Sequence, residues 1–149
     1  MKYILLDTSI LIGAFDTDFN NEQHLQDRQL VSELLQDESV KIAITPLIRH
    51  EVLQGIQNID FDEMKDILDD FMEFNINDEV ANQTARIFHF SRSDEFIALN
   101  LGIKLNKQKF DLFHYVVAKN RDLELISSNQ KDFSKIDKVV NAMPINPFE

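Results

Sequence analysis

Residues 3–9 of the chain have the sequence YILLDTS. Residues 3–6 form a short apolar run that lacks the polar alternation of a strand with one exposed face. Such a run is typical of a strand buried on both faces of a parallel sheet. Asp7 then stands at the carboxyl end of the strand, and Asp7, Thr8 and Ser9 are residue types that cap a helix. The stretch therefore predicts a strand that leads directly into a helix.

The same alternation of strand and helix continues along the chain. Besides residues 3–6, short apolar segments predict strands at 41–44, 74–76, 123–126 and 139–140. Helical spacing of apolar residues predicts helices at 10–15, 25–35, 46–56, 62–74, 78–90, 94–101, 111–120 and around 133–136. This order predicts an α/β domain, in which a mainly parallel central sheet of about five short strands lies between helical layers.

Length and composition indicate one globular domain. With 149 residues and 44% hydrophobic content, the chain can bury roughly 70% of its unfolded surface in a single core. We therefore expect one domain over residues 1–149.

The sequence also predicts where the protein resides. No charge-free apolar run approaches the roughly 18–20 residues of a membrane helix, and the N-terminal residues lead into a strand, not a signal peptide. The chain has no cysteine, which fits a reducing compartment. We expect a cytoplasmic protein without a membrane partner.

The charge of the chain is distributed unevenly. The net charge is −11, which argues against a surface that binds nucleic acid everywhere. Residues 1–103 carry 7 basic and 20 acidic side chains, whereas residues 104–149 carry 8 basic and 6 acidic ones. These eight basic residues are either a basic lip or an ordinary solvated helical surface: Lys104, Lys107, Lys109, Lys119, Arg121, Lys131, Lys135 and Lys138.

Oxygen-bearing side chains follow the predicted strands. Asp7 and Asn129 stand after strand ends, where open parallel sheets bind ligands, and Glu51 and Asp111 belong to helices that flank those ends. If these groups converge, they form a hard oxygen cluster that suits Mg²⁺ or Mn²⁺. Each also has a plainer interpretation: Asp7, Asp111 and Asn129 as helix caps, and Glu51 as a half-exposed helical carboxylate.

Three blocks of sequence together resemble the PIN-domain family, and especially VapC-like toxins of toxin–antitoxin pairs. The first is the strand that ends in Asp7-Thr8-Ser9. The second is TPLIRHEV at residues 45–52, and the third joins FDLFHYVVA at 110–118 to LISSNQKDF at 125–133. The resemblance extends from residue 3 to about residue 136. It implies a three-layer α/β/α PIN-like domain.

The resemblance also implies a site and a reaction. Asp7, Glu51 and Asp111 match three metal-binding positions of the family, and the fourth corresponds to Asn129 or Asp132. Ser9 either supports the cation through its water or simply caps a helix. The implied activity is hydrolysis of RNA phosphodiester bonds by a Mg²⁺- or Mn²⁺-dependent ribonuclease, with Asp7, Glu51 and Asp111 as catalytic residues.

Partners follow from the same resemblance. VapC-like nucleases dimerise and are silenced by a small antitoxin, so we expect a homodimer, an antitoxin and an RNA substrate. Near the acidic residues, His114, one turn after Asp111, fits a structural or substrate-side role better than that of general acid. Arg49 and His50 beside Glu51 fit surface or partner contacts.

Other functions share parts of this pattern. A receiver-like signalling domain would have paired acids after the first strand, but Thr8 and Ser9 follow Asp7. A haloacid-dehalogenase-type phosphatase would have a second Asp where Ser9 stands. A catalytically weakened PIN-like interaction module remains an alternative, because Asn129 would deplete the fourth metal position.

Overall fold

A computed structural model describes residues 1–16 and 21–149. Along the chain its elements follow in this order: β1 (Lys2–Leu6), α1 (Thr8–Phe15), α2 (Glu22–Gln36), β2 (Val40–Ile44), α3 (Pro46–Gly55), α4 (Phe61–Asp69), β3 (Met72–Glu73), α5 (Asp78–Ser91), α6 (Asp94–Ile97), α7 (Lys109–Arg121), β4 (Glu124–Ile126) and α8 (Gln130–Ala142). The predicted α/β class is confirmed.

The chain forms two compact units. Unit 1 contains Met1–Asn75 and Leu123–Ser128, and therefore all the strands named above, whereas unit 2 contains Ile76–Asp122 and Asn129–Glu149 and is helical. The expectation of one domain over residues 1–149 stays a prediction.

The sheet of unit 1 is parallel. In the described part of the chain it has four strands in the order β3-β2-β1-β4. Leu5 of the central strand β1 aligns with Ala43 on one side and Leu125 on the other. Leu5 and Leu6 are fully buried, as predicted for a strand covered on both faces.

The predicted fifth strand at residues 139–140 is wrong. These residues lie in α8, where Phe133, Ile136 and Val139 are buried at a spacing of three residues. This spacing places them on one face of a helix, and a valine pair alone could not reveal it.

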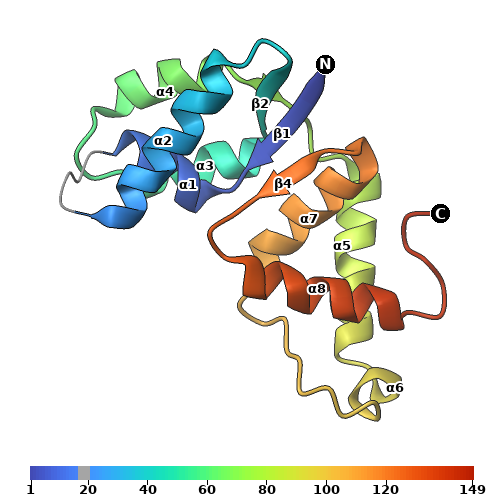
Figure 1. The fold of residues 1–149 in the computed structure, drawn as a ribbon. Helices are drawn as coiled ribbons and strands as arrows, with labels where there is room; N and C mark the ends of the chain where they lie inside the picture. Colours follow the sequence, from blue (N-terminus) through green and yellow to red (C-terminus); the bar gives the residue numbers. More distant parts are fainter. Residues whose placement is uncertain (17–20) are drawn as a thin grey trace. The chain divides into compact units, whose positions relative to one another are not determined.

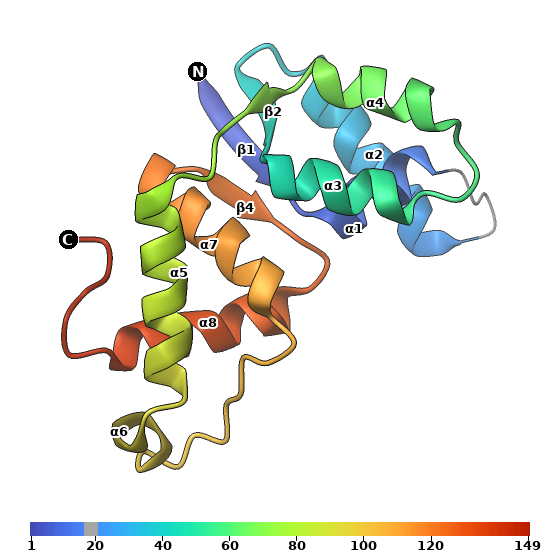
Figure 2. The same ribbon diagram turned by 180° about the vertical axis from the view of Figure 1, so that it is seen from behind.

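Helices α1 to α4 connect the strands of unit 1. The connections from β1 to β2 and from β2 to β3 join parallel neighbours in the same direction across the sheet, so right-handed crossovers place their helices on one face. Figures 1 and 2 both show these four helices on the same side of β1 and β2.

The end of α1 is fixed to the loop after α3. The Asp16 carboxylate accepts hydrogen bonds from the backbone N–H groups of Gln57, Asn58 and Ile59 at 2.6–2.9 Å. Burial raises the pKa of Asp16, but these three donors outweigh it and hold the pKa below its usual value. The carboxylate therefore ties the two segments together.

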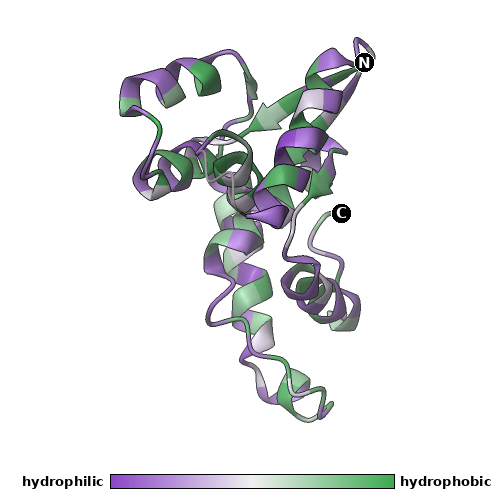
Figure 3. Cartoon of the chain, turned by 60° about the vertical axis from the view of Figure 1, so that its left-hand side comes forward, coloured by the Kyte–Doolittle hydropathy of each residue, from purple (hydrophilic) through white to green (hydrophobic). Residues whose placement is uncertain are grey.

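Unit 2 is built from three long helices. Helix α7 packs against α5 and α8 (Figure 2), and Ile87, Val116 and Ile136, one from each helix, are fully buried. The Tyr115 hydroxyl donates to Asp137 at 2.5 Å, which connects α7 to α8. Alternating hydrophobic and hydrophilic bands along the helices in Figure 3 fit helices that bury one face.

Candidate active site

Asp7 occupies the junction of β1 and α1, as the sequence predicts. Its backbone N–H donates to Ile126 at the end of β4, so the carboxyl ends of the two neighbouring strands meet here. Asp7 is also the N-cap residue of α1. The two interpretations of Asp7, as a helix cap and as a candidate functional residue, are therefore compatible.

Several donors orient the Asp7 carboxylate, which is only 7% exposed. Oδ1 accepts from the Thr8 backbone N–H at 2.8 Å, and Oδ2 accepts from the Ser127 hydroxyl at 2.7 Å. The Ser9 hydroxyl lies 3.5 Å from Oδ2 and 2.8 Å from the Ser128 hydroxyl. The carboxylate is therefore held in one orientation by groups from the start of α1 and from the segment after β4.

Glu51 is connected to this group through Thr8. Helix α3 begins as predicted, because the Thr45 hydroxyl caps Ile48 N–H and Pro46 occupies the first turn. This start places Glu51 in the second turn of the helix, where its Oε1 accepts a hydrogen bond of 3.2 Å from the Thr8 hydroxyl. Within unit 1, Thr8 thus links the two carboxylates, because its backbone N–H donates to Asp7 and its hydroxyl donates to Glu51.

Asp111 lies in the first turn of α7, in unit 2. The helix begins at Lys109 with Gln108 as its N-cap residue, so the alternative in which Asp111 caps the helix is wrong. Asp111 is half-buried. The N-terminal end of a helix favours a negative charge, and this position stabilises the ionised carboxylate by about 0.3–1 kcal/mol.

Asn129 and Asp132 are joined to each other in unit 2. The Asn129 amide donates to Asp132 Oδ2, Gln108 donates to Oδ1 at 3.1 Å, and the Lys135 ammonium lies 3.7 Å from it. In the described part of the chain, the Asn129 side chain forms no capping hydrogen bond with α8. Asn129 and Asp132, the two candidates for the fourth metal-binding position of the family, therefore form one hydrogen-bonded group.

The neighbours of the acidic residues have structural contacts. His114 is fully buried on α7. Arg49 forms ion pairs with Asp69 at 2.7 Å and with Glu73 at 2.8 Å, so it links α3 to the end of α4 and to β3. His50 is exposed.

Sequence reasoning missed three residues that hold the acidic groups. The sequence pattern indicates a capping role for Thr8 and no site role for Ser127 or Gln108. Ser9-to-Ser128 and Ser127-to-Asp7 contacts join residues about 120 positions apart. The signal in the sequence is that hydroxyl-bearing residues follow the ends of β1 and β4.

The chain belongs to the PIN domain family. The family model, described as PIN domain, matches residues 4–139 and thus covers both units. A search of curated proteins found no match. Proteins of this family are generally nucleases, so membership supports a hydrolase that acts on nucleic acid. None of the described helices combines the length and the apolar composition of a membrane-spanning segment.

Proposed function

We propose that this protein is a Mg²⁺- or Mn²⁺-dependent ribonuclease that hydrolyses RNA phosphodiester bonds. The observation that carries the proposal is the oriented Asp7 carboxylate in a chain of the PIN domain family. A buried carboxylate held by hydroxyl and amide donors at the carboxyl ends of parallel strands is a suitable ligand for a hard cation.

The side chains proposed for the cation all bear oxygen, and most of them are carboxylates. We assign Asp7 and Asp111 as direct ligands and Glu51 as a ligand or as the group that orients water, with Ser9 in support. Asn129 and Asp132, which are bonded to each other, would support a second ion. This donor set contains hard oxygens and no thiolate, which fits Mg²⁺ or Mn²⁺.

The protein contributes to the reaction by holding the reacting groups in position. A bound cation supplies the electrophilic charge that activates water and offsets the negative charge of the phosphodiester. Thr8 holds Glu51, and Ser127 holds Asp7, so each carboxylate keeps one orientation while RNA binds. Basic residues after position 103 offset the acidic remainder of the chain, which would otherwise repel RNA.

The biological role we propose is that of a VapC-like toxin in a toxin–antitoxin pair. The support is the resemblance of the three sequence blocks together with the family match. In this role the protein is cytoplasmic, forms a homodimer and is silenced by a small antitoxin, and its acidic surface favours a basic partner. Induced expression in a bacterial host should arrest growth, and Asp7→Asn should abolish the arrest.

A second candidate is a catalytically weakened PIN-like interaction module. The observation in its favour is Asn129, a neutral residue at one of the two candidates for the fourth family position. The neighbouring Asp132 argues for activity, because it returns a carboxylate to the same polar group. A receiver-like signalling domain is disfavoured by the family match.

Cleavage of RNA by the purified protein tests the ribonuclease proposal. Structured and unstructured RNAs are incubated with Mg²⁺ or Mn²⁺, with and without a chelator. Cleavage should require the cation and should be lost in Asp7→Asn. Asp62→Asn also removes one negative charge, but at an exposed position on α4, and should leave cleavage intact. The proposal is wrong if every RNA stays intact, or if cleavage survives both the chelator and Asp7→Asn.

A further inference from the structure

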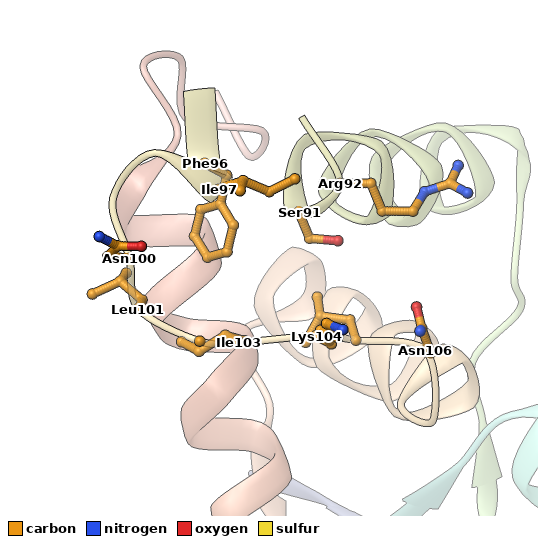
Figure 4. A pocket seen from close by; sticks show the side chains of 11 residues that line it. Ser91, Arg92, Phe96, Ile97, Asn100, Leu101, Ile103, Lys104 and Asn106 are labelled. Atoms are coloured by element: carbon orange, nitrogen blue, oxygen red, sulfur yellow. The ribbon is translucent and has the colours of Figure 1, made fainter. Parts of the chain in front are cut away.

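Unit 2 contains a pocket that the proposed catalytic groups do not use. It lies between the end of α5, helix α6 and the segment from residue 100 to residue 106 that leads toward α7 (Figure 4), and its volume is about 430 Å³. Sites for small organic groups have volumes of roughly 300–1,000 Å³. The pocket is therefore large enough for a nucleobase.

One wall of the pocket is apolar and continues onto the surface. Phe96 and Ile103 line it, and Ile97 and Leu101 line it while remaining 61% and 51% exposed. Leu99, between them, is 50% exposed. Figure 3 shows this tip of the unit, at the bottom of the view, as largely hydrophobic. Exposed apolar side chains gathered beside a pocket indicate a binding surface.

The backbone turns sharply along the apolar wall of the pocket. Asn100 and Gly102 have φ angles of 57° and 67°, in the left-handed region. These angles turn the chain on both sides of Leu101. Asn100 and Asn106 add amide groups to the lining, and such groups can hydrogen-bond the edge of a base.

Two cations contact the Phe88 ring near this pocket. Arg92, which lines the pocket, lies with its guanidinium carbon 4.7 Å from the centre of the Phe88 ring, and the Lys109 ammonium lies 5.5 Å from the same centre. Arg92 is the C-cap residue of α5 and Lys109 is the first residue of α7, so the Phe88 ring is a contact shared by cations from two segments. Such a pair suits the phosphates of a nucleic acid backbone.

The charge of this region contrasts with the rest of the chain. Four basic residues, Arg92, Lys104, Lys107 and Lys109, stand between positions 91 and 109, against Asp94 and Glu95. The whole chain carries −11. A polyanion is therefore attracted to this segment and repelled by most of the remaining surface. Lys109 also shares the first turn of α7 with Asp111.

We propose that the pocket binds one base of a single-stranded RNA that flanks the cleaved bond, while Arg92 and Lys109 bind its phosphates. The inference rests on the proposed ribonuclease function. A base presents an apolar face to Ile97 and Leu101 and its polar edge to the amides, and the cation pair neutralises the adjoining backbone. The pocket thus selects unpaired RNA, whose bases are free to leave the stack.

Binding measurements without cleavage test the phosphate contacts. A short fluorescent single-stranded RNA is titrated with the protein in chelator, so that the strand stays intact, at several salt concentrations. Two phosphate contacts contribute about 1.4 to the slope of log affinity against log salt. The double variant Arg92→Gln, Lys109→Gln should lose that amount. The matched variant Arg86→Gln, Lys41→Gln, which removes two exposed cations outside the pocket, should keep the slope.

Abasic RNAs test the base pocket without changing the protein. Each oligonucleotide of a series lacks one base at a different position and keeps all phosphates. One position should lower the affinity at least about fivefold, the lower end for a stacked base. Leu101→Ser should make binding insensitive to that position, whereas Leu35→Ser, which changes a leucine of similar exposure on α2, should retain the sensitivity.

The outcomes separate this inference from the ribonuclease proposal. If the salt slope is unchanged in the Arg92, Lys109 variant and no abasic position matters, the inference is wrong even when RNA is cleaved. If Leu101→Ser dissociates a dimer and leaves RNA binding intact, the surface is a protein interface, which also overturns the inference. Loss of cleavage in every assay, with position-specific RNA binding retained, contradicts the ribonuclease proposal alone.

Discussion

The Thr8 hydroxyl is the direct connection between the Asp7 junction and Glu51. Thr8→Val keeps the shape of the side chain and removes the donor. If Glu51 holds the cation or orients water, this change should lower cleavage roughly 10- to 100-fold, as loss of a group that orients a metal ligand does.

The measurement for Thr8 is the Mn²⁺ concentration that gives half-maximal cleavage, together with the rate at saturating Mn²⁺. Thr8→Ser retains a hydroxyl and should behave as the wild type. Equal rates and equal Mn²⁺ requirements in Thr8→Val would show that Glu51 needs no positioning by Thr8.

Asp16 is the second residue whose replacement gives a defined result. Its carboxylate accepts three backbone hydrogen bonds, so Asp16→Asn should lower the free energy of unfolding by roughly 1.5–3 kcal/mol at pH 7. The pKa of folded Asp16 lies below the ordinary value of 3.8, so its contribution is complete above 3.8 and is lost as the pH falls through the folded pKa.

Urea unfolding of the wild type and Asp16→Asn at several pH values measures this difference. The gap in free energy should be constant above about pH 5, because Asp16 is ionised there in both states. It should narrow below 3.8. Glu38→Gln, an exposed change of the same charge, should show no comparable gap. A gap that widens toward low pH would contradict the assignment.

At the residue scale, the sequence predicted where Asp7 lies but could not predict what holds it. A strand followed by Asp-Thr-Ser is a local pattern, so the position of Asp7 follows from residues 3–9 alone. The donor from Ser127 depends on β1 pairing with β4, a contact between residues 120 positions apart. No short stretch of the sequence indicates that β1 pairs with β4.

At the scale of elements, the predictions succeeded where caps and spacing agreed. The helix predicted over residues 46–56 begins at Pro46, where Thr45 caps it. The helix predicted over residues 94–101 extends only over Asp94–Ile97, because the chain turns through Asn100 and Gly102 with positive φ angles. Gly102 is a residue type that often follows a helix end. The sequence gives no clear signal that Asn100, two residues earlier, adopts the αL conformation.

Helix α1 packs closely on α2 at Gly13. A Cβ added to Gly13 would lie 2.0 Å from Asp27 Oδ2, and Asp27 is itself buried. Gly13→Ala should therefore destabilise the protein by about 1–3 kcal/mol, although alanine alone favours a helix. Thermal unfolding measures the change.

A double variant shows whether the Asp27 contact causes that loss. Asp27→Ala removes the clashing carboxylate, so Gly13→Ala should cost much less in that background. Equal costs with and without the Asp27 carboxylate would place the strain elsewhere in the packing of α1.

At the scale of the whole molecule, the proposed metal ligands belong to both compact units. Asp7 and Glu51 are in unit 1, and Asp111, Asn129 and Asp132 are in unit 2. The family match spans both units, so the sequence pattern that predicted the ligands also runs across them. Composition and length could not reveal this division, because they are the same for one compact unit and for two.

A shared cation has a measurable consequence for the whole chain. A ligand at about a hundredfold excess over its dissociation constant stabilises the native state by about 2.7 kcal/mol, which corresponds to roughly 5–10 °C in melting temperature at this chain length. Mn²⁺ should raise the melting temperature of the wild type by this amount. Asp7→Asn and Asp111→Asn should each abolish the increase, because each removes a proposed ligand of that ion.

Matched variants identify which residues hold that ion. Asp62→Asn changes the net charge by the same amount at an exposed site and should keep the full increase. Asp132→Asn should reduce the increase only at high Mn²⁺, since its group would serve a second and weaker ion. If Asp111→Asn retains the whole increase while Asp7→Asn loses it, the ion is held by unit 1 alone, and the assignment of Asp111 as a ligand is wrong.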